Sequence, residues 1–159
     1  MNNICQSMKH EVISISISAT IREAAALFVA EHIGTLPVVD ADEKLAGILH
    51  IRDLLELVMP SFIGLVEDFD FVRGDFSVFE TLRPSPEEAN QPASSIMDPP
   101  VSVRASSGLL RAFAIMDSHH LYDLPVVDDD ERLVGLASRV DIGTALLTGW
   151  SSAAVEGAD

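Results

Sequence analysis

Two segments of this chain place polar side chains where they could bind a ligand. Residues 135–141 read Gly-Leu-Ala-Ser-Arg-Val-Asp and residues 47–53 read Gly-Ile-Leu-His-Ile-Arg-Asp. Ser138 and Asp141 form a Ser-x-x-acid pattern, in which a hydroxyl and a carboxylate satisfy free N–H groups at the start of a helix. The helix dipole also favours an acid in the first turn. Taken alone, this pattern favours a helix cap over a ligand site.

Other reactive side chains give weaker signals. His119 and His120 lie close to Asp117 and Asp123, but adjacent residues at a helix end point in different directions, and no third ligand follows at a standard metal spacing. We therefore expect surface or packing roles for them and no metal site. Serine, histidine and aspartate all occur, yet no segment has the pattern of a nucleophile elbow or another catalytic signature. The sequence predicts a protein that is not an enzyme.

Composition restricts the class of partner. The chain has 159 residues, 48% of them hydrophobic, which is enough to fill a core in one ordinary domain or two very small ones. Ten basic residues face 25 acidic ones, for a formal net charge of −15. Nucleic-acid binding depends on lysine and arginine neutralising phosphates. The scattered basic residues cannot supply such a surface, so we exclude DNA and RNA as partners.

Cysteine content and apolar patterning bear on location. Cys5 is the one cysteine, so an intramolecular disulfide is impossible, as is usual in a reducing compartment. The first residues do not have the basic start and apolar core of a signal peptide. No apolar run approaches the roughly 20 residues that a membrane helix needs. We therefore expect a cytoplasmic protein without membrane contact.

The chain contains an internal repeat at a shift of 88 residues. Leu-Pro-Val-Val-Asp at 36–40 returns at 124–128, and the same shift places Gly47 on Gly135 and Asp53 on Asp141. A unit of fewer than about 60 residues buries too little surface to be stable alone. The two copies should therefore pack against each other about a pseudo-twofold axis, with a cleft between them as the natural site.

Each copy has the pattern strand, helix, strand, strand, helix, which predicts a mixed α/β fold of two β-α-β-β-α repeats. Thr20 and Glu23 have the capping-box spacing and predict the start of the first helix. The expected elements cover residues 13–17, 20–31, 36–39, 45–49 and 51–58 in the first copy, and 101–103, 108–119, 124–127, 133–137 and 139–147 in the second.

The remaining segments define the domain boundaries. We expect a first repeat at 1–59, an insert at 60–95, a second repeat at 96–149 and a flexible tail at 150–159. The insert holds five of the seven phenylalanines, and helical spacing of Phe62, Leu65, Val66 and Phe69 predicts that it is partly helical. Packing of this insert on the protein's own repeats is favoured over a dedicated partner surface.

The order of elements, with Leu-Pro-Val-Val-Asp before Gly-x-x-x-x-x-Asp in two copies, resembles the cystathionine β-synthase (CBS) domain family over residues 8–59 and 96–149. The resemblance implies a paired module that binds adenosine-containing ligands, commonly dimerises, and regulates an attached or partner protein. The family's binding signature is a glycine, two apolar residues, a serine or threonine, two variable residues and an aspartate. The second copy keeps this signature at residues 135–141.

The resemblance also implies residue roles. The Asp141 carboxylate would accept hydrogen bonds from both ribose hydroxyls, and Ser138 with the adjoining helix start would meet phosphate. Ser102 would line the base or ribose, and Arg139 would add charge for phosphate. In the first copy His50 replaces the hydroxyl residue, so Asp53 is the weaker ribose contact. We expect one competent site, centred on the second copy.

Two functions compete. In the leading hypothesis AMP, ADP or ATP occupies the cleft of a homodimeric regulatory module, which needs no cofactor and signals to an unidentified effector protein. S-adenosylmethionine or NAD is a variant that would keep the ribose contact. The alternative is a ligand-independent dimerisation or interaction scaffold that presents the Phe-rich insert.

Overall fold

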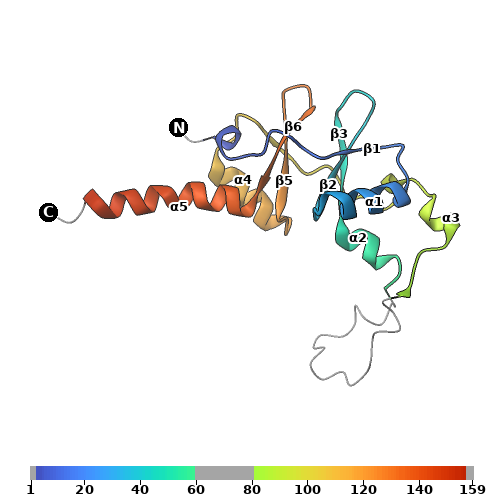
Figure 1. The fold of residues 1–159 in the computed structure, drawn as a ribbon. Helices are drawn as coiled ribbons and strands as arrows, with labels where there is room; N and C mark the ends of the chain where they lie inside the picture. Colours follow the sequence, from blue (N-terminus) through green and yellow to red (C-terminus); the bar gives the residue numbers. More distant parts are fainter. Residues whose placement is uncertain (1–2, 60–80, 157–159) are drawn as a thin grey trace, which may run out of the picture.

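The computed structural model describes residues 3–59 and 81–156. The five phenylalanines of the insert lie outside these residues, as does the helix expected around them. The first repeat contains β1 (Ile15–Ser16), α1 (Ile21–Glu31), β2 (Thr35–Val39), β3 (Leu45–His50) and α2 (Ile51–Glu56). The second contains β4 (Val103–Arg104), α4 (Leu109–Ser118), β5 (Asp123–Val127), β6 (Leu133–Ser138) and α5 (Arg139–Glu156). The predicted order of elements is confirmed in both copies (Figure 1).

Local sequence explains how the helices begin. At the start of α1, the Glu23 N–H donates to Thr20 Oγ1 at 3.2 Å and the Thr20 N–H donates to the Glu23 carboxylate at 2.8 Å. The predicted capping box is therefore present. A short helix, α3 (Pro86–Ala89), begins in the same way at Ser85.

The helix α5 differs from expectation. It continues to Glu156 instead of ending at Leu147, and Figure 1 shows it projecting from the body of the second repeat. Gly149 costs about 1 kcal/mol relative to alanine inside a helix, which is too little to end one. The alanines at 153 and 154 are strong helix formers. The first residues of the expected tail therefore continue the helix.

Each repeat forms a three-stranded sheet with the same topology. In the first, β1 pairs parallel to β2 and β2 pairs antiparallel to β3, with Leu36 opposite Leu49. In the second, β4, β5 and β6 pair in the same way, with Leu124 opposite Ala137. The two registers are identical after the shift of 88 residues. The helices α1 and α4 make the crossovers that parallel neighbours require.

The two repeats meet through equivalent residues. The Leu45 N–H donates to the Glu131 carbonyl and the Leu133 N–H donates to the Glu43 carbonyl, both at 3.1 Å. Each bond becomes the other when the repeats are exchanged, because 43 and 45 correspond to 131 and 133. Such reciprocal pairs occur only around a twofold axis, so the predicted pseudo-twofold arrangement is confirmed.

The segment before each repeat packs on the other repeat. We call residues 3–9 the first leader and residues 93–98 the second leader. In the first leader, Lys9 exchanges two backbone hydrogen bonds with Leu136, at 2.9 and 3.0 Å. In the second leader, Asp98 exchanges two with Ile48, at 3.0 and 2.8 Å. The end of the expected insert is therefore the leader of the second repeat.

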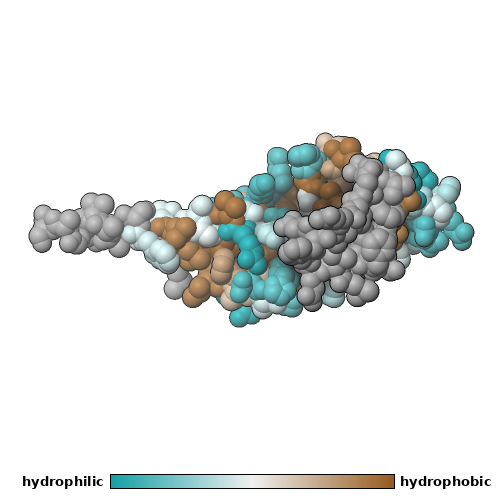
Figure 2. Space-filling model, turned by 90° about the horizontal axis from the view of Figure 1, so that it is seen from below, coloured by the Kyte–Doolittle hydropathy of each residue, from teal (hydrophilic) through white to brown (hydrophobic). Residues whose placement is uncertain are grey.

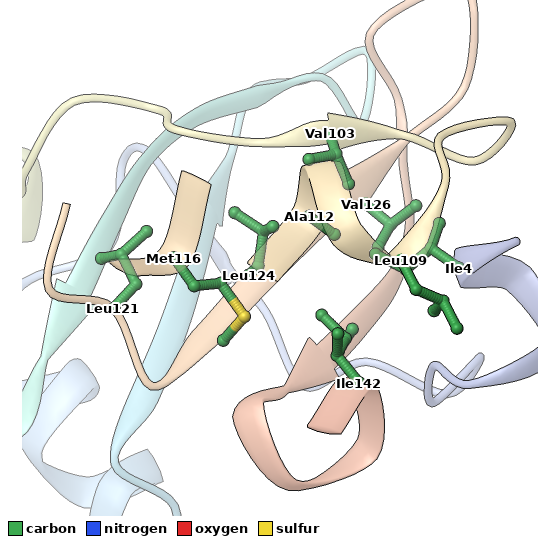
Figure 3. Packing of buried hydrophobic residues seen from close by; sticks show 10 residues of the cluster. Ile4, Val103, Leu109, Ala112, Met116, Leu121, Leu124, Val126 and Ile142 are labelled. Carbon is green, nitrogen blue, oxygen red and sulfur yellow. The ribbon is translucent and has the colours of Figure 1, made fainter. Parts of the chain in front are cut away.

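Each repeat has its own hydrophobic core, completed by the exchanged leader. Ile4 of the first leader is fully buried among second-repeat residues, as Figure 3 shows. Ala93 of the second leader is likewise buried in the first-repeat core. The second core also contains Val103, Leu109, Ala112, Met116, Leu121, Leu124, Val126, Ala137 and Ile142. Within residues 3–59 and 81–156, no helix has the length and apolarity needed to cross a bilayer.

Candidate functional site

Ser138 and Asp141 come together where β6 passes into α5. The Ser138 N–H donates to Asp141 Oδ2 at 3.0 Å, and the Asp141 N–H donates to Ser138 Oγ at 3.0 Å. The pair is therefore a helix cap, as its spacing predicts. One oxygen of the Asp141 carboxylate is used in the cap. The other accepts no hydrogen bond within the part of the chain that the structure describes, which leaves it available to a ligand.

A hollow of about 420 Å³ lies beside Asp141. One wall comes from the first leader, residues 6–9, and the other from α5. Its volume lies within the range of small-molecule pockets, roughly 300–1,000 Å³. Lys9, an exposed residue of the first leader, also lines this hollow. The sequence did not indicate Lys9, because its position depends on the leader exchange. The α5 residues of the wall are Asp141, Thr144, Ala145 and Thr148.

Arg139 is engaged with the end of α4. Its Nε donates to the Leu121 carbonyl at 2.6 Å and its Nη2 to the Met116 carbonyl at 3.3 Å. The guanidinium also lies 5.7 Å from the centre of the Tyr122 ring. A cation at a helix C-terminus balances the negative end of the dipole. Arg139 thus contacts α4, and it does not line the hollow beside Asp141.

Ser102 lies apart from the Ser138–Asp141 pair. It lines a different hollow of about 220 Å³, together with Arg104 and Arg111. The structure therefore brings Ser138, Asp141 and Lys9 to one place and puts Ser102 and Arg139 elsewhere.

The first repeat has a different set of groups at the equivalent junction of β3 and α2. Asp53 Oδ2 accepts the His50 N–H at 2.7 Å, as Asp141 does for Ser138. The His50 ring nitrogen Nδ1 lies 3.5 Å from Asp53 Oδ2 and 3.0 Å from Asp98 Oδ2. Asp98 belongs to the second leader. It pairs with Ile48 as Lys9 pairs with Leu136, so Asp98 and Lys9 occupy equivalent places, one residue out of the 88-residue register. The first junction therefore carries two carboxylates and an imidazole.

A larger hollow, of about 530 Å³, lies between the repeats beside His50. Thr35 and Asp123 face each other in it, and the Thr35 hydroxyl donates to Asp123 Oδ2 at 2.8 Å. This hollow is the inter-repeat cleft that the repeat predicts. The residues of the first junction line it, namely His50 and Arg52 of the first copy and Asp98 of the second leader, whereas Ser138 and Asp141, which were expected at this cleft, do not. The rest of its lining includes His119, His120, Leu121 and Tyr122.

Two β-α-β-β-α units about a pseudo-twofold axis, with a hollow at a Ser-x-x-Asp helix start, define a tandem-repeat α/β module. The family model described as CBS domain matches residues 3–60 and 93–148. The chain therefore belongs to the CBS domain family and is a CBS-domain pair, which confirms the resemblance seen in the sequence.

Known proteins resemble this chain in sequence and in fold. The chloroplastic CBS domain-containing protein CBSX1 of Arabidopsis thaliana is 31% identical over 143 residues, which are 87% of this chain. The chain spans 61% of that relative's length. The structure of CBSX2 in complex with AMP, a protein of the same plant, superposes with a TM-score of 0.68 at 24% identity, covering 93% of this chain and 98% of that one. The CBS pair of MJ0100, solved with 5′-methylthioadenosine and S-adenosylmethionine, gives 0.65 at 20% identity, with coverages of 91% and 99%.

Proposed function

We propose that this CBS pair is a regulatory module that binds an adenine nucleotide (AMP, ADP or ATP) at the Ser138–Asp141 helix start. The observation that carries the proposal is the Asp141 carboxylate oxygen that accepts no hydrogen bond from the described residues, beside a hollow that Lys9 also lines. We further propose a cytoplasmic, non-enzymatic protein. Cys5, the one thiol, donates a hydrogen bond to the Ala105 carbonyl at 3.2 Å and can form no disulfide within the chain.

Each part of a nucleotide has a chemical match in this hollow. A carboxylate accepts well from the two neighbouring hydroxyls of a ribose. The positive end of the 18-residue α5 and the Lys9 ammonium suit a phosphate. The ligands of CBSX2 and MJ0100, AMP and the two adenosyl compounds, support the adenosine class. S-adenosylmethionine and NAD would share the ribose contact with Asp141.

Binding at this place would connect the two repeats. The hollow lies between the first leader and α5 of the second repeat, so a bound nucleotide would hold these elements together. A ligand shifts a conformational equilibrium only by its differential affinity for the two states. In a state in which the first leader has moved away from α5, the nucleotide would lose its contacts with residues 6–9. We propose that an effector protein binds one of these two states.

Isothermal titration tests the proposal. The intact chain is titrated with AMP, ADP, ATP, S-adenosylmethionine and NAD, alongside Asp141→Ala, Asp53→Ala and the exposed control Asp130→Ala. We expect saturable binding of at least one adenine nucleotide, its loss in Asp141→Ala and a smaller effect of Asp53→Ala. Absence of binding up to millimolar ligand would overturn the proposal. Equal losses in Asp141→Ala and Asp53→Ala would contradict a single principal site.

A dimerisation scaffold is the second candidate function, and one observation favours it. Val140, Leu147 and Trp150 are 70%, 50% and 73% exposed on α5, and their spacing places them on one side of the helix. Figure 2 shows brown, hydrophobic patches towards the α5 end of the molecule. We propose that this side of α5 joins two copies. Light scattering after size exclusion should give a dimer mass, and a monomer mass for Trp150→Ser.

A further inference from the structure

The cluster of His50, Asp53 and Asp98 at the first junction has the composition of a metal site. We propose that these three side chains bind a divalent transition-metal ion of the zinc type, with His50 Nδ1 and one carboxylate oxygen from each aspartate as ligands. Imidazole nitrogen with carboxylate oxygen is a usual donor set for Zn²⁺. This site is separate from the proposed nucleotide site, and neither inference depends on the other.

The distances between the donor atoms suit such an ion. The candidate ligand atoms of the three residues all lie within 4.8 Å of one another. His50 Nδ1 lies 3.0 Å from Asp98 Oδ2 and 3.5 Å from Asp53 Oδ2. Zinc bonds of about 2.0–2.1 Å place two donors of a tetrahedron roughly 3.3 Å apart. The observed separations bracket that edge, so small side-chain rotations would complete three of the four ligand positions and leave the fourth to water.

The charges of the cluster also favour a bound cation. The Asp53 side chain is 8% exposed and the His50 side chain 17% exposed. The Asp98 side chain is 45% exposed, and its Oδ2 lies within hydrogen-bond distance of His50 Nδ1. Two carboxylates therefore converge on one ring nitrogen at the edge of a partly buried site, where a bound cation would offset their mutual repulsion. Arg52 is the one other cation within ion-pair range among the described residues, with Nη2 4.0 Å from Asp98 Oδ2 and a side chain 68% exposed. At that distance and exposure Arg52 neutralises little.

The second repeat supplies an internal comparison. The residues in the positions of His50, Asp53 and Asp98 are Ser138, Asp141 and Lys9. The two junctions share their backbone hydrogen bonds, including those of each leader to the neighbouring strand. One junction therefore carries a hydroxyl and an ammonium group, which suit an anion. The other carries an imidazole and a second carboxylate, which suit a cation.

The support around the ligands is already in place. The His50 N–H donates to Asp53 Oδ2 at 2.7 Å, which orients that carboxylate. The Asp98 backbone is fixed to Ile48 by two hydrogen bonds. Outer contacts of this kind orient metal ligands. An ion here would connect the end of β3, the first turn of α2 and the second leader, so it should also stabilise the first repeat.

The test is a zinc titration of the intact, chelator-stripped chain, read by competition with a chromophoric chelator and by thermal unfolding. Matched variants are His50→Gln and Asp98→Asn. The control is the double variant His119→Gln/His120→Gln, because these two histidines line the inter-repeat hollow together with His50 and Asp98. Circular dichroism checks that each variant is folded. Substitution with Co²⁺ adds a readout, because its visible absorption reports nitrogen and oxygen ligands directly.

We expect one zinc per chain, a rise in unfolding temperature with zinc, and affinity at least tenfold weaker in His50→Gln and Asp98→Asn, consistent with loss of a ligand. The double control should keep its affinity within a factor of two. Unchanged zinc affinity in His50→Gln, or a loss confined to the double control, would overturn the assignment. So would tighter binding of Mg²⁺ than of Zn²⁺.

Discussion

Thr35 and Asp123 occupy equivalent positions in the two repeats, 88 residues apart, and are hydrogen-bonded to each other across the pseudo-twofold axis at 2.8 Å. Two identical residues would meet at this point in a perfectly symmetric pair. Two aspartates would repel, and two threonines would form a weaker bond between neutral groups. The divergence of the repeats has produced a donor on one side and an acceptor on the other.

The first prediction concerns this bond. Thr35 is 5% exposed, so Thr35→Val leaves Asp123 without its donor at nearly constant volume. A hydrogen bond to a charged group contributes about 1.5–3 kcal/mol, and urea unfolding should show a loss of that size. Ser118→Ala, which removes an exposed hydroxyl bonded to the Ile115 carbonyl, is the control. A loss in Thr35→Val no larger than in the control would contradict a stabilising role for the axis contact.

The second prediction compares Gly47 and Gly135, where each leader crosses a strand. A Cβ at Gly47 would meet Met97 and also the Asp98 backbone oxygen, at 2.8 Å, whereas the three atoms nearest to a Cβ at Gly135 all belong to the Met8 side chain. The Asp98 backbone cannot move aside to make room, whereas the flexible Met8 side chain can change its rotamer. Gly47→Ala should therefore cost about 1–3 kcal/mol, and more than Gly135→Ala, in chemical denaturation. A larger stability loss in Gly135→Ala than in Gly47→Ala would show that the second leader is less firmly fixed than its hydrogen bonds indicate.

The third prediction concerns Lys9, which extends the proposed nucleotide site to the first leader. Lys9→Ala should weaken AMP binding by about tenfold, the equivalent of one charge-assisted hydrogen bond. Adenosine, which has no phosphate, should bind both proteins equally. Isothermal titration of both ligands makes the comparison, with Lys44→Ala as the matched lysine control. A similar loss of adenosine and AMP would show that Lys9 acts on the position of the leader and not on phosphate.

Local patterns in the sequence predicted most of the fold. The Thr20–Glu23 box, the Ser138–Asp141 cap and the alternating strands depend on residues within a few positions of one another, and all are present. The internal repeat then predicted that the two units pack about a pseudo-twofold axis. Helix α5 was predicted too short, because small and polar residues after Trp150 suggested a tail although alanine is a strong helix former.

The site was less predictable than the fold. Ser138 and Asp141 are close in sequence, so their contact followed from spacing. Lys9 and Asp98 reach the two junctions only because each leader crosses to the opposite repeat, and that exchange depends on contacts such as Lys9 with Leu136 that no short pattern encodes. The cluster of His50, Asp53 and Asp98 was missed for the same reason, since its third member comes from a distant segment.

The last prediction separates structural from ligand-binding roles at Arg139. Its guanidinium donates to two carbonyls, one in the last turn of α4 and one just after it, and lies over Tyr122. Removing it leaves the Leu121 carbonyl without its donor, while the Met116 carbonyl keeps the Leu121 N–H at 2.8 Å. Arg139→Ala should therefore lower the free energy of unfolding by about 1–3 kcal/mol. Because the side chain does not line the Asp141 hollow, AMP affinity should change less than in Lys9→Ala. Urea unfolding and isothermal titration of both variants measure the two effects. A loss of AMP binding in Arg139→Ala as large as in Lys9→Ala, with stability unchanged, would show that the guanidinium leaves α4 to contact phosphate.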